Sequence, residues 1–270
     1  KSDDLSPLDE KTVPLEVAPL VSSVNDLLGR LKDSIGTQKR FLADAAHQLK
    51  TPLAGLRMQA DLAQRKDAGE EELKQSLQQI GRASVQATHT VNQLLSLARA
   101  EGAGAIDWQS CDMAALISEV LNDSLPHAMD KGLDLGYDGV DTEQKRRFVT
   151  VQGNPTLLKE MIRNLVDNAI HYTPSTAERM GVITVRLLVD PYSQALAVQV
   201  EDNGPGIAAA ERERVFEPFY RALGSNVDGS GLGLPIVREI AQRHGATVTV
   251  EQAHPGQTPP GACFTIRFSR

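Results

Sequence analysis

Apolar residues recur at every seventh position in the first part of the chain, over five consecutive steps. This spacing predicts a long amphipathic helix that packs through its apolar stripe in the manner of a coiled coil. We expect the helix to run from about Val17 to about Arg65. The residues of the stripe are Leu28, Ile35, Leu42, Leu49, Leu56 and Ala63.

A second apolar stripe predicts a further helix from about Glu71 to Glu101. Because only the short stretch 66–70 separates the two helices, we expect them to form an antiparallel hairpin. A single hairpin buries its stripes only in part, and a second copy would complete the core of a four-helix bundle. The sequence therefore predicts a homodimer.

The pattern of apolar residues changes after 102–104, a glycine-rich stretch that we expect to act as a hinge-like linker. Short strand-like runs then alternate with helical patterns, which predicts an α/β sandwich with one mixed sheet and helices on one face. The whole chain is thus expected to be α+β, with domains at 1–35, 36–102 and 103–270. The expected strands are 132–137, 147–152, 182–189, 196–201, 247–251 and 262–268, and the expected helices lie near 112–130, 154–171 and 231–244.

Composition and charge narrow the classes of function. A net charge of -7 over 270 residues gives no indication of the basic surface that nucleic-acid binding requires. Cys111 and Cys263 lie far apart without metal-ligand spacing, so we expect two buried thiols in a reducing compartment, the cytoplasm. No apolar run reaches the length of a membrane-spanning helix. Because the chain begins at Lys1 rather than Met, a preceding membrane-attached part is compatible with the sequence.

His47 is the first candidate for chemistry. It lies off the apolar stripe of the first helix, at the outermost heptad position, and Pro52 follows within the same helical pattern. A neutral imidazole nitrogen is a competent nucleophile toward a phosphoryl group. An exposed histidine is more often only a solvated side chain, but a proline inside a helix costs stability and usually has a reason.

Two polar segments in the second half are candidates for binding a nucleotide. Asn164 and Asn168 are four residues apart on a predicted helix, where a neutral carboxamide oxygen suits Mg²⁺ bridged to phosphates. Asp202 directly follows a strand and would accept a hydrogen bond from an amine such as that of adenine, in a turn shaped by Gly204 and Gly206. Taken singly, the first segment is equally typical of two surface asparagines, and the second is typical of an ordinary turn.

A third segment, the glycine-rich stretch 229–234, opens the last predicted helix. Free amides at such a helix start form an anion site suited to phosphates. About twenty residues precede it, a length that is typical of a functional lid. Phe216 and Phe219 would anchor this lid, and Arg221 would reach a terminal phosphate.

Five segments together resemble the sensor histidine kinases of two-component systems, in the order and spacing of that family, over about 36–270. Residues 1–35 resemble the end of the HAMP-like linker that follows a membrane helix in such receptors. The resemblance implies the cytoplasmic portion of a bacterial inner-membrane protein. The five segments are FLADAAHQLKTPL (41–53), NLVDNAIHY (164–172), DNGPGI (202–207), FEPFYR (216–221) and GSGLGLPIV (229–237).

The resemblance implies ATP and Mg²⁺ as cofactors of the second domain, which would have the histidine-kinase and gyrase type of fold. Asn168 would hold the metal ion, with Asn164 on the phosphate side. Asp202 would accept a hydrogen bond from the adenine amine, and Tyr172 would lie against the base. The other implied nucleotide-site residues are His171, Gly204, Gly206, Phe216, Arg221, Gly229, Gly231 and Gly233.

The resemblance also implies that His47 accepts the phosphoryl group and passes it to an aspartate of a response regulator. Thr51, one turn later, would position a water when the protein dephosphorylates that regulator. Two residues depart from the family pattern. Gln48 replaces an acidic residue, which leaves no base beside His47, and His171 replaces a Lys or Arg, so its charge would vary with pH near 6.5.

Two other functions compete with this interpretation. A gyrase-like ATPase shares the nucleotide segments, but it carries a Glu at the position of Asn164 to activate water, and this chain offers no such base. A non-catalytic dimeric scaffold that binds nucleotide is the second alternative, and Gln48 keeps it open.

Overall fold

The computed structural model describes residues 6, 8, 14, 17–64, 69–101, 108–139, 149–190, 195–221 and 230–269. The predicted linker at 102–104, most of the turn at 66–70, and 222–229, which include the last part of the predicted lid and Gly229, lie outside this set. The chain divides into two compact units, Lys1–Ala87 and Thr88–Arg270. Within the described residues, no helix is long and apolar enough to cross a membrane.

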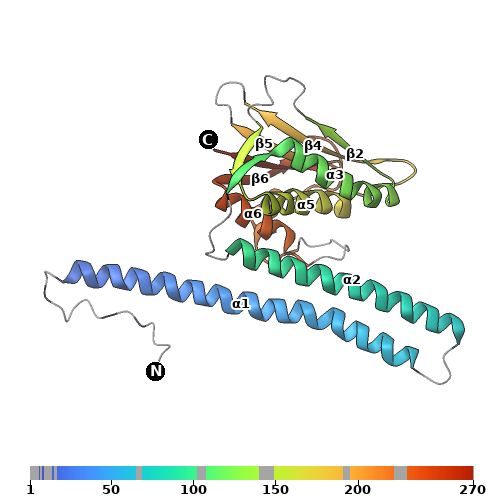
Figure 1. Ribbon diagram of the computed structural model, residues 1–270, viewed down its shortest axis with the longest axis horizontal. Coiled ribbons are helices and arrows are strands. Elements are labelled where there is room, and N and C mark those ends of the chain that lie inside the picture. The colour runs from blue at the N-terminus through green and yellow to red at the C-terminus, as the bar shows by residue number, and fades with distance from the viewer. Residues whose placement is uncertain are drawn as a thin grey trace. The chain divides into compact units, whose positions relative to one another are not determined.

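The first unit consists of helix α1 (Ala18–Ala63) and the start of helix α2 (Glu70–Glu101), which Figure 1 draws as antiparallel helices. Both helices match the predicted ranges to within two residues. A proline in the first turn, where no amide partner is needed, helps α1 to begin. Three glutamates in the first turn of α2 complement the positive end of its dipole. Pro52 lies inside α1 without ending it.

The apolar stripes of the first unit stay largely open. Leu53 of α1 and Leu77 of α2 are 55% and 56% exposed. The described residues of the seven-residue stripe are all half-buried, namely Leu28, Ile35, Leu49, Leu56 and Ala63. Among the described residues of this unit, the buried hydrophobic side chains are Val21 and Ala45. One copy of the hairpin therefore leaves apolar surface uncovered, and the homodimer stays a prediction.

The second unit is built on a mixed sheet of five strands with the order β2-β4-β5-β7-β6. β2 runs parallel to β4, and the other neighbours are antiparallel. Alternate residues of β5 and β7 are buried, which defines one core face. The strands are β2 (Leu133–Asp138), β4 (Gly181–Val189), β5 (Leu196–Asp202), β6 (Ala246–Gln252) and β7 (Ala262–Phe268).

Three helices cover this core face, which confirms the predicted sandwich (Figure 1). The Asp112 side chain caps α3 by accepting from the amides of Ala114 and Ala115, and Asn154 caps α5 by accepting from Leu157 N. α5 lies between the other two and packs against both. The helices are α3 (Met113–Asp130), α5 (Pro155–Tyr172) and α6 (Gly233–Arg243).

The prediction of one sheet is wrong in one respect. The strand expected at 147–152 is β3 (Thr150–Gly153), which pairs with β1 (Gln109–Asp112) in a separate two-stranded sheet. β1 could not be predicted because its four residues, Gln-Ser-Cys-Asp, lack both apolar alternation and β-branched side chains. The thiol of Cys111 is buried in β1 as expected, whereas Cys263 is only half-buried.

Candidate functional site

Asp202 ends the central strand β5 with a buried carboxyl group, only 7% exposed. Its Oδ1 accepts from Gly204 N at 2.9 Å and from Ala262 N at 3.3 Å. Burial raises the pKa of this carboxyl, and the two amide bonds partly oppose the shift. Among the described residues both bonds reach one oxygen, so Oδ2 stays available to an incoming donor such as an amine.

Glycines form the backbone wall around Asp202. A Cβ on Gly204 would lie 3.0 Å from Asp202 Oδ1 and 3.1 Å from the carbonyl oxygen of Tyr172. Gly206 has φ +74°, and a Cβ on this residue would overlap the carbonyl oxygen of Gly261. A Cβ on Gly261 would lie 2.1 Å from the Asp202 carbonyl oxygen. This turn thus needs its glycines for its own packing, and Gly261 is a residue that the sequence did not single out.

Asn164 and Asn168 lie on α5, one helical turn apart. Asn164 is 7% exposed, so the reading of two surface asparagines is wrong for it. Its Nδ2 donates to the carbonyl oxygen of Glu160 at 2.9 Å and to Glu160 Oε1 at 3.3 Å. Asn168 is half-buried. At the end of the helix, Tyr172 is half-buried and its ring centroid lies 6.2 Å from that of the exposed His171.

The start of α6 lies beside Asn164. A Cβ on Gly233, the first residue of α6, would come within 3.2 Å of Asn164 Oδ1. Gly231 has φ +70°, and a Cβ there would lie 2.8 Å from the backbone of Phe219. The third predicted segment therefore packs against the Asn164 carboxamide of the first.

The described part of the predicted lid is held by aromatic packing. Phe216 is buried and meets Phe264 edge-on, with ring centroids 6.3 Å apart. The guanidinium of Arg238, from α6, lies 4.5 Å above the Phe216 ring. Phe219 adopts a positive φ of 63° and donates from its amide to the carbonyl oxygen of Gly231 at 2.9 Å. Arg221 is exposed at the end of the described segment.

The residues of the second unit fit an adenine nucleotide with a bound divalent ion. A buried acceptor suits the amine of the base, and helix amides suit the phosphates. Neutral carboxamide oxygens suit a hard cation whose charge the phosphates already balance. The other three predicted residues lie on α1 of the first unit, where Thr51 is exposed and the side chains of His47 and Gln48 fall outside the described part.

Four residues that the sequence did not single out belong to the walls of this site. Glu160 accepts a hydrogen bond from Asn164, and Gly261 lies against the backbone of Asp202. The guanidinium of Arg238 packs on the ring of Phe216. Thr173 follows Tyr172, and its buried hydroxyl has no partner among the described residues. Of these residues only Glu160 could have been found from the sequence, because its position four residues before Asn164 places the two side chains on one helical face. The others depend on contacts between distant segments.

Two family models match the chain. The model of the His Kinase A (phospho-acceptor) domain matches residues 37–103. The model described as histidine kinase-, DNA gyrase B- and HSP90-like ATPase matches residues 153–270.

Among curated proteins, the chain is similar to the Sensor protein QseC of Salmonella typhi. The two are 37% identical over 254 residues, which cover 93% of this chain and 53% of that protein. The chain spans about half the length of the curated relatives that it matches.

Two solved structures are also similar. The Mycobacterial sensor histidine kinase MprB is 30% identical, with a TM-score of 0.50, and the match covers 60% of this chain and 96% of that one. The histidine kinase ThkA in complex with response regulator protein TrrA shares the fold at 20% identity, with a TM-score of 0.68 over 88% of this chain and 63% of that one.

Proposed function

Because the chain belongs to the sensor histidine kinases of two-component systems, we propose that it is a protein-histidine kinase that transfers the γ-phosphoryl group of ATP to His47. The phosphoryl group then passes to an aspartate of a response regulator. The observation that carries the proposal is that three predicted segments lie against one another, through the contacts of Gly204 with Tyr172 and of Gly233 with Asn164.

In this proposal the second unit binds and orients ATP. Asp202 accepts a hydrogen bond from the adenine amine, Tyr172 lies against the base, and the amides near Gly231 and Gly233 bind the phosphates. Asn168 would hold Mg²⁺, which neutralises charge on the phosphates as the phosphoryl group leaves. The pKa of Asp202 matters here, because only its charged form accepts the amine proton with either oxygen.

His47 acts as the nucleophile through an unprotonated ring nitrogen. The nitrogen forms a bond to the γ-phosphorus while the bond to the bridging oxygen breaks and ADP departs. Gln48 orients without accepting a proton, so the reaction depends on positioning and charge neutralisation rather than on a base. We therefore expect a slower transfer than in relatives with an acidic residue at this position.

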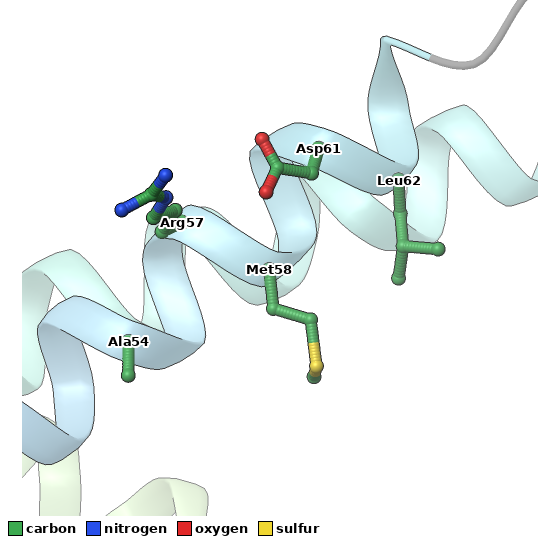
Figure 2. Close-up of a pocket in the computed structure, with 5 residues that line it drawn as sticks. All are labelled: Ala54, Arg57, Met58, Asp61 and Leu62. Carbon is green, nitrogen blue, oxygen red and sulfur yellow. The ribbon is translucent and has the colours of Figure 1, made fainter.

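A surface depression on α1 supports the response regulator as a partner. Ala54, Met58 and Leu62 point the same way in Figure 2, beside Arg57 and Asp61. On an ideal helix Ala54, Met58 and Asp61 lie within about 40° of the direction of His47. Met58 is 58% exposed although it is apolar. An exposed apolar spot on the face of the phosphoacceptor suits a docked receiver domain.

Three finer points of the proposal rest on the same family membership. Thr51, one turn after His47, would position a water for dephosphorylation of the regulator. Two copies would pair through exposed apolar residues of α1 and α2, such as Leu53 and Leu77. Residues 1–35, 36–102 and 103–270 would be the end of a HAMP-like linker, the dimerisation and phosphotransfer domain, and the catalytic domain of a membrane receptor's cytoplasmic portion.

The test is incubation of the chain with γ-labelled ATP and Mg²⁺ beside a His47→Ala variant. We expect an acid-labile, alkali-stable label on the parent chain and none on the variant, with equal nucleotide affinity in both. A parent chain that binds nucleotide but takes no label would support the scaffold function. Release of labelled phosphate without labelled protein, at equal rates in both chains, would support the ATPase.

A further inference from the structure

Glu160 is a charged residue on α5 that bonds Asn164 of the predicted nucleotide site without belonging to any of the site's sequence segments. It lies four residues before Asn164, and it offers that residue two acceptors. Asn164 Nδ2 donates to the Glu160 carbonyl oxygen at 2.9 Å and to Glu160 Oε1 at 3.3 Å. A carboxamide has two N–H hydrogens, so both are used at Glu160.

This pairing fixes which end of the Asn164 carboxamide faces the site. A flipped carboxamide would set its oxygen against the two Glu160 oxygens and would lose both hydrogen bonds. With the nitrogen held at Glu160, Oδ1 points to the start of α6, 3.2 Å from where a Gly233 Cβ would lie. Asn164 is 7% exposed, so water provides little compensation for a flipped group.

We infer that Glu160 is a positioning residue that holds Asn164 as an acceptor in the nucleotide site. This inference rests on the proposed function. Phosphate oxygens need donors, and an acceptor at this position repels them. A hydrated divalent cation carries waters that donate, so the Asn164 oxygen binds a water of the Mg²⁺ shell beside the ion held by Asn168. Glu160 thus raises the affinity for Mg²⁺-nucleotide and not for nucleotide alone.

The experiment measures the affinity of the full chain for a non-hydrolysable ATP analogue by calorimetry, once with Mg²⁺ and once with EDTA. The ratio of the two affinities reports the gain from the metal ion. Glu160→Ala is expected to lower this ratio about tenfold, the typical cost of losing a residue that orients a metal-site group. Its affinity in EDTA should stay within about twofold of the parent value, since no phosphate contact is lost.

Three further variants separate positioning from a structural role. Glu160→Gln keeps an oxygen that accepts from Asn164 and should retain most of the ratio. Arg163→Ala, next to Asn164 but paired with Asp123 on α3, should leave the ratio unchanged. In an Asn164→Ala background, Glu160→Ala should have no further effect, because the group that it positions is gone.

Two results would overturn the inference. Equal weakening by Glu160→Ala with Mg²⁺ and with EDTA would mean that Glu160 only supports the helix. Additive effects of Glu160→Ala and Asn164→Ala would mean that the two residues act separately. A parent chain that binds no nucleotide under either condition would instead overturn the proposed function, and this inference with it.

Discussion

The two units of the chain differ in how far their apolar side chains are buried. In the second unit, side chains such as Leu165, Ile183 and Ile236 are fully buried between the sheet and the helices. In the first unit, the described apolar residues of α1 and α2 are mostly half-buried or exposed, with Leu77 at 56%. The second unit, which we name the catalytic unit after its proposed function, thus closes its own core, whereas the helical hairpin leaves apolar surface uncovered.

The same contrast holds for glycine. A Cβ added at Gly55 or Gly81 in the hairpin meets no atom within 4 Å, whereas one added at Gly204 would be tightly packed and one at Gly261 would overlap its neighbours. A dense interior transmits a small change in volume to the site, and an open helix surface does not. Substitutions in the two units should therefore differ in size and in the property that they change.

Gly261→Ala should have the largest effect. The new Cβ would lie 2.1 Å from the Asp202 carbonyl oxygen, at a φ of +67° that L residues rarely adopt. We expect a loss of at least about 4 kcal/mol of stability, and loss of nucleotide binding because Asp202 must move. Urea unfolding and nucleotide titration measure both.

Gly245→Ala is the matched control, because it has a φ of +63° and open space around its Cβ. It should cost about 1–2 kcal/mol and leave nucleotide affinity unchanged. Equal losses of stability in the two variants would mean that backbone conformation, and not the contact with Asp202, accounts for both.

A pair of leucine truncations compares the two cores directly. Leu165→Ala, at a fully buried site on α5, should destabilise the catalytic unit by about 2–5 kcal/mol. Leu77→Ala should change the stability of that unit little and weaken association of two copies. Fluorescence of the one tryptophan, Trp108 in the second unit, follows the first effect, and sedimentation equilibrium follows the second. A Leu77→Ala chain that associates like the parent would exclude this stripe from the dimer.

Much of this architecture is predictable from the sequence, because long-range periodicity encodes it. The helical pattern predicted both ends of α1 to within two residues, and strand-like runs predicted β5 and β7. The two-stranded sheet was missed because the pairing of β1 with β3 depends on segments about forty residues apart and on no apolar pattern. The segments around Asn164 and Asp202 were found, but not Gly261, whose role appears only when β7 is paired beside β5.

Asp202→Asn should separate function from stability within the catalytic unit. It removes a charged acceptor, so nucleotide affinity should fall about 30-fold, or about 2 kcal/mol. Stability near neutral pH should not fall, because burial raises the pKa of Asp202 and so disfavours its charged form in the folded state. Asp61→Asn on the hairpin should change neither property. A fall in stability as large as the fall in binding would make Asp202 mainly structural.

His244 should make the catalytic unit sensitive to acid. Its Nε2 accepts from Asn154 N at 3.1 Å and its Nδ1 lies 2.7 Å from the Ile240 carbonyl oxygen, which requires the neutral ring with Nδ1–H. Burial lowers the pKa of His244 in the folded state, and Arg243 adds to this. The unfolded chain then binds the extra proton first, so stability is complete above an unfolded pKa of about 6.5 and declines as pH falls below it.

Urea unfolding between pH 8 and pH 5, followed by Trp108, tests this decline, because the Trp108 ring lies 5.3 Å from that of His244. A His244→Gln variant lacks the titrating group. Its stability should start lower at pH 8 and fall less steeply. Identical slopes for the parent and the variant would rule His244 out as the source of the acid sensitivity.

Gly81→Ala in α2 should have the smallest effect and the opposite sign. Alanine loses less backbone freedom than glycine in a helix interior, and its Cβ meets nothing within 4 Å in one copy of the chain. We expect a gain of about 1 kcal/mol in hairpin stability, seen in thermal unfolding by far-UV circular dichroism, with unchanged nucleotide affinity. A loss of stability, with weaker association of two copies, would mean that side chains of a second copy occupy the space beside Gly81. The openness of the hairpin would then belong to the single copy alone, and the contrast between the units would vanish on assembly.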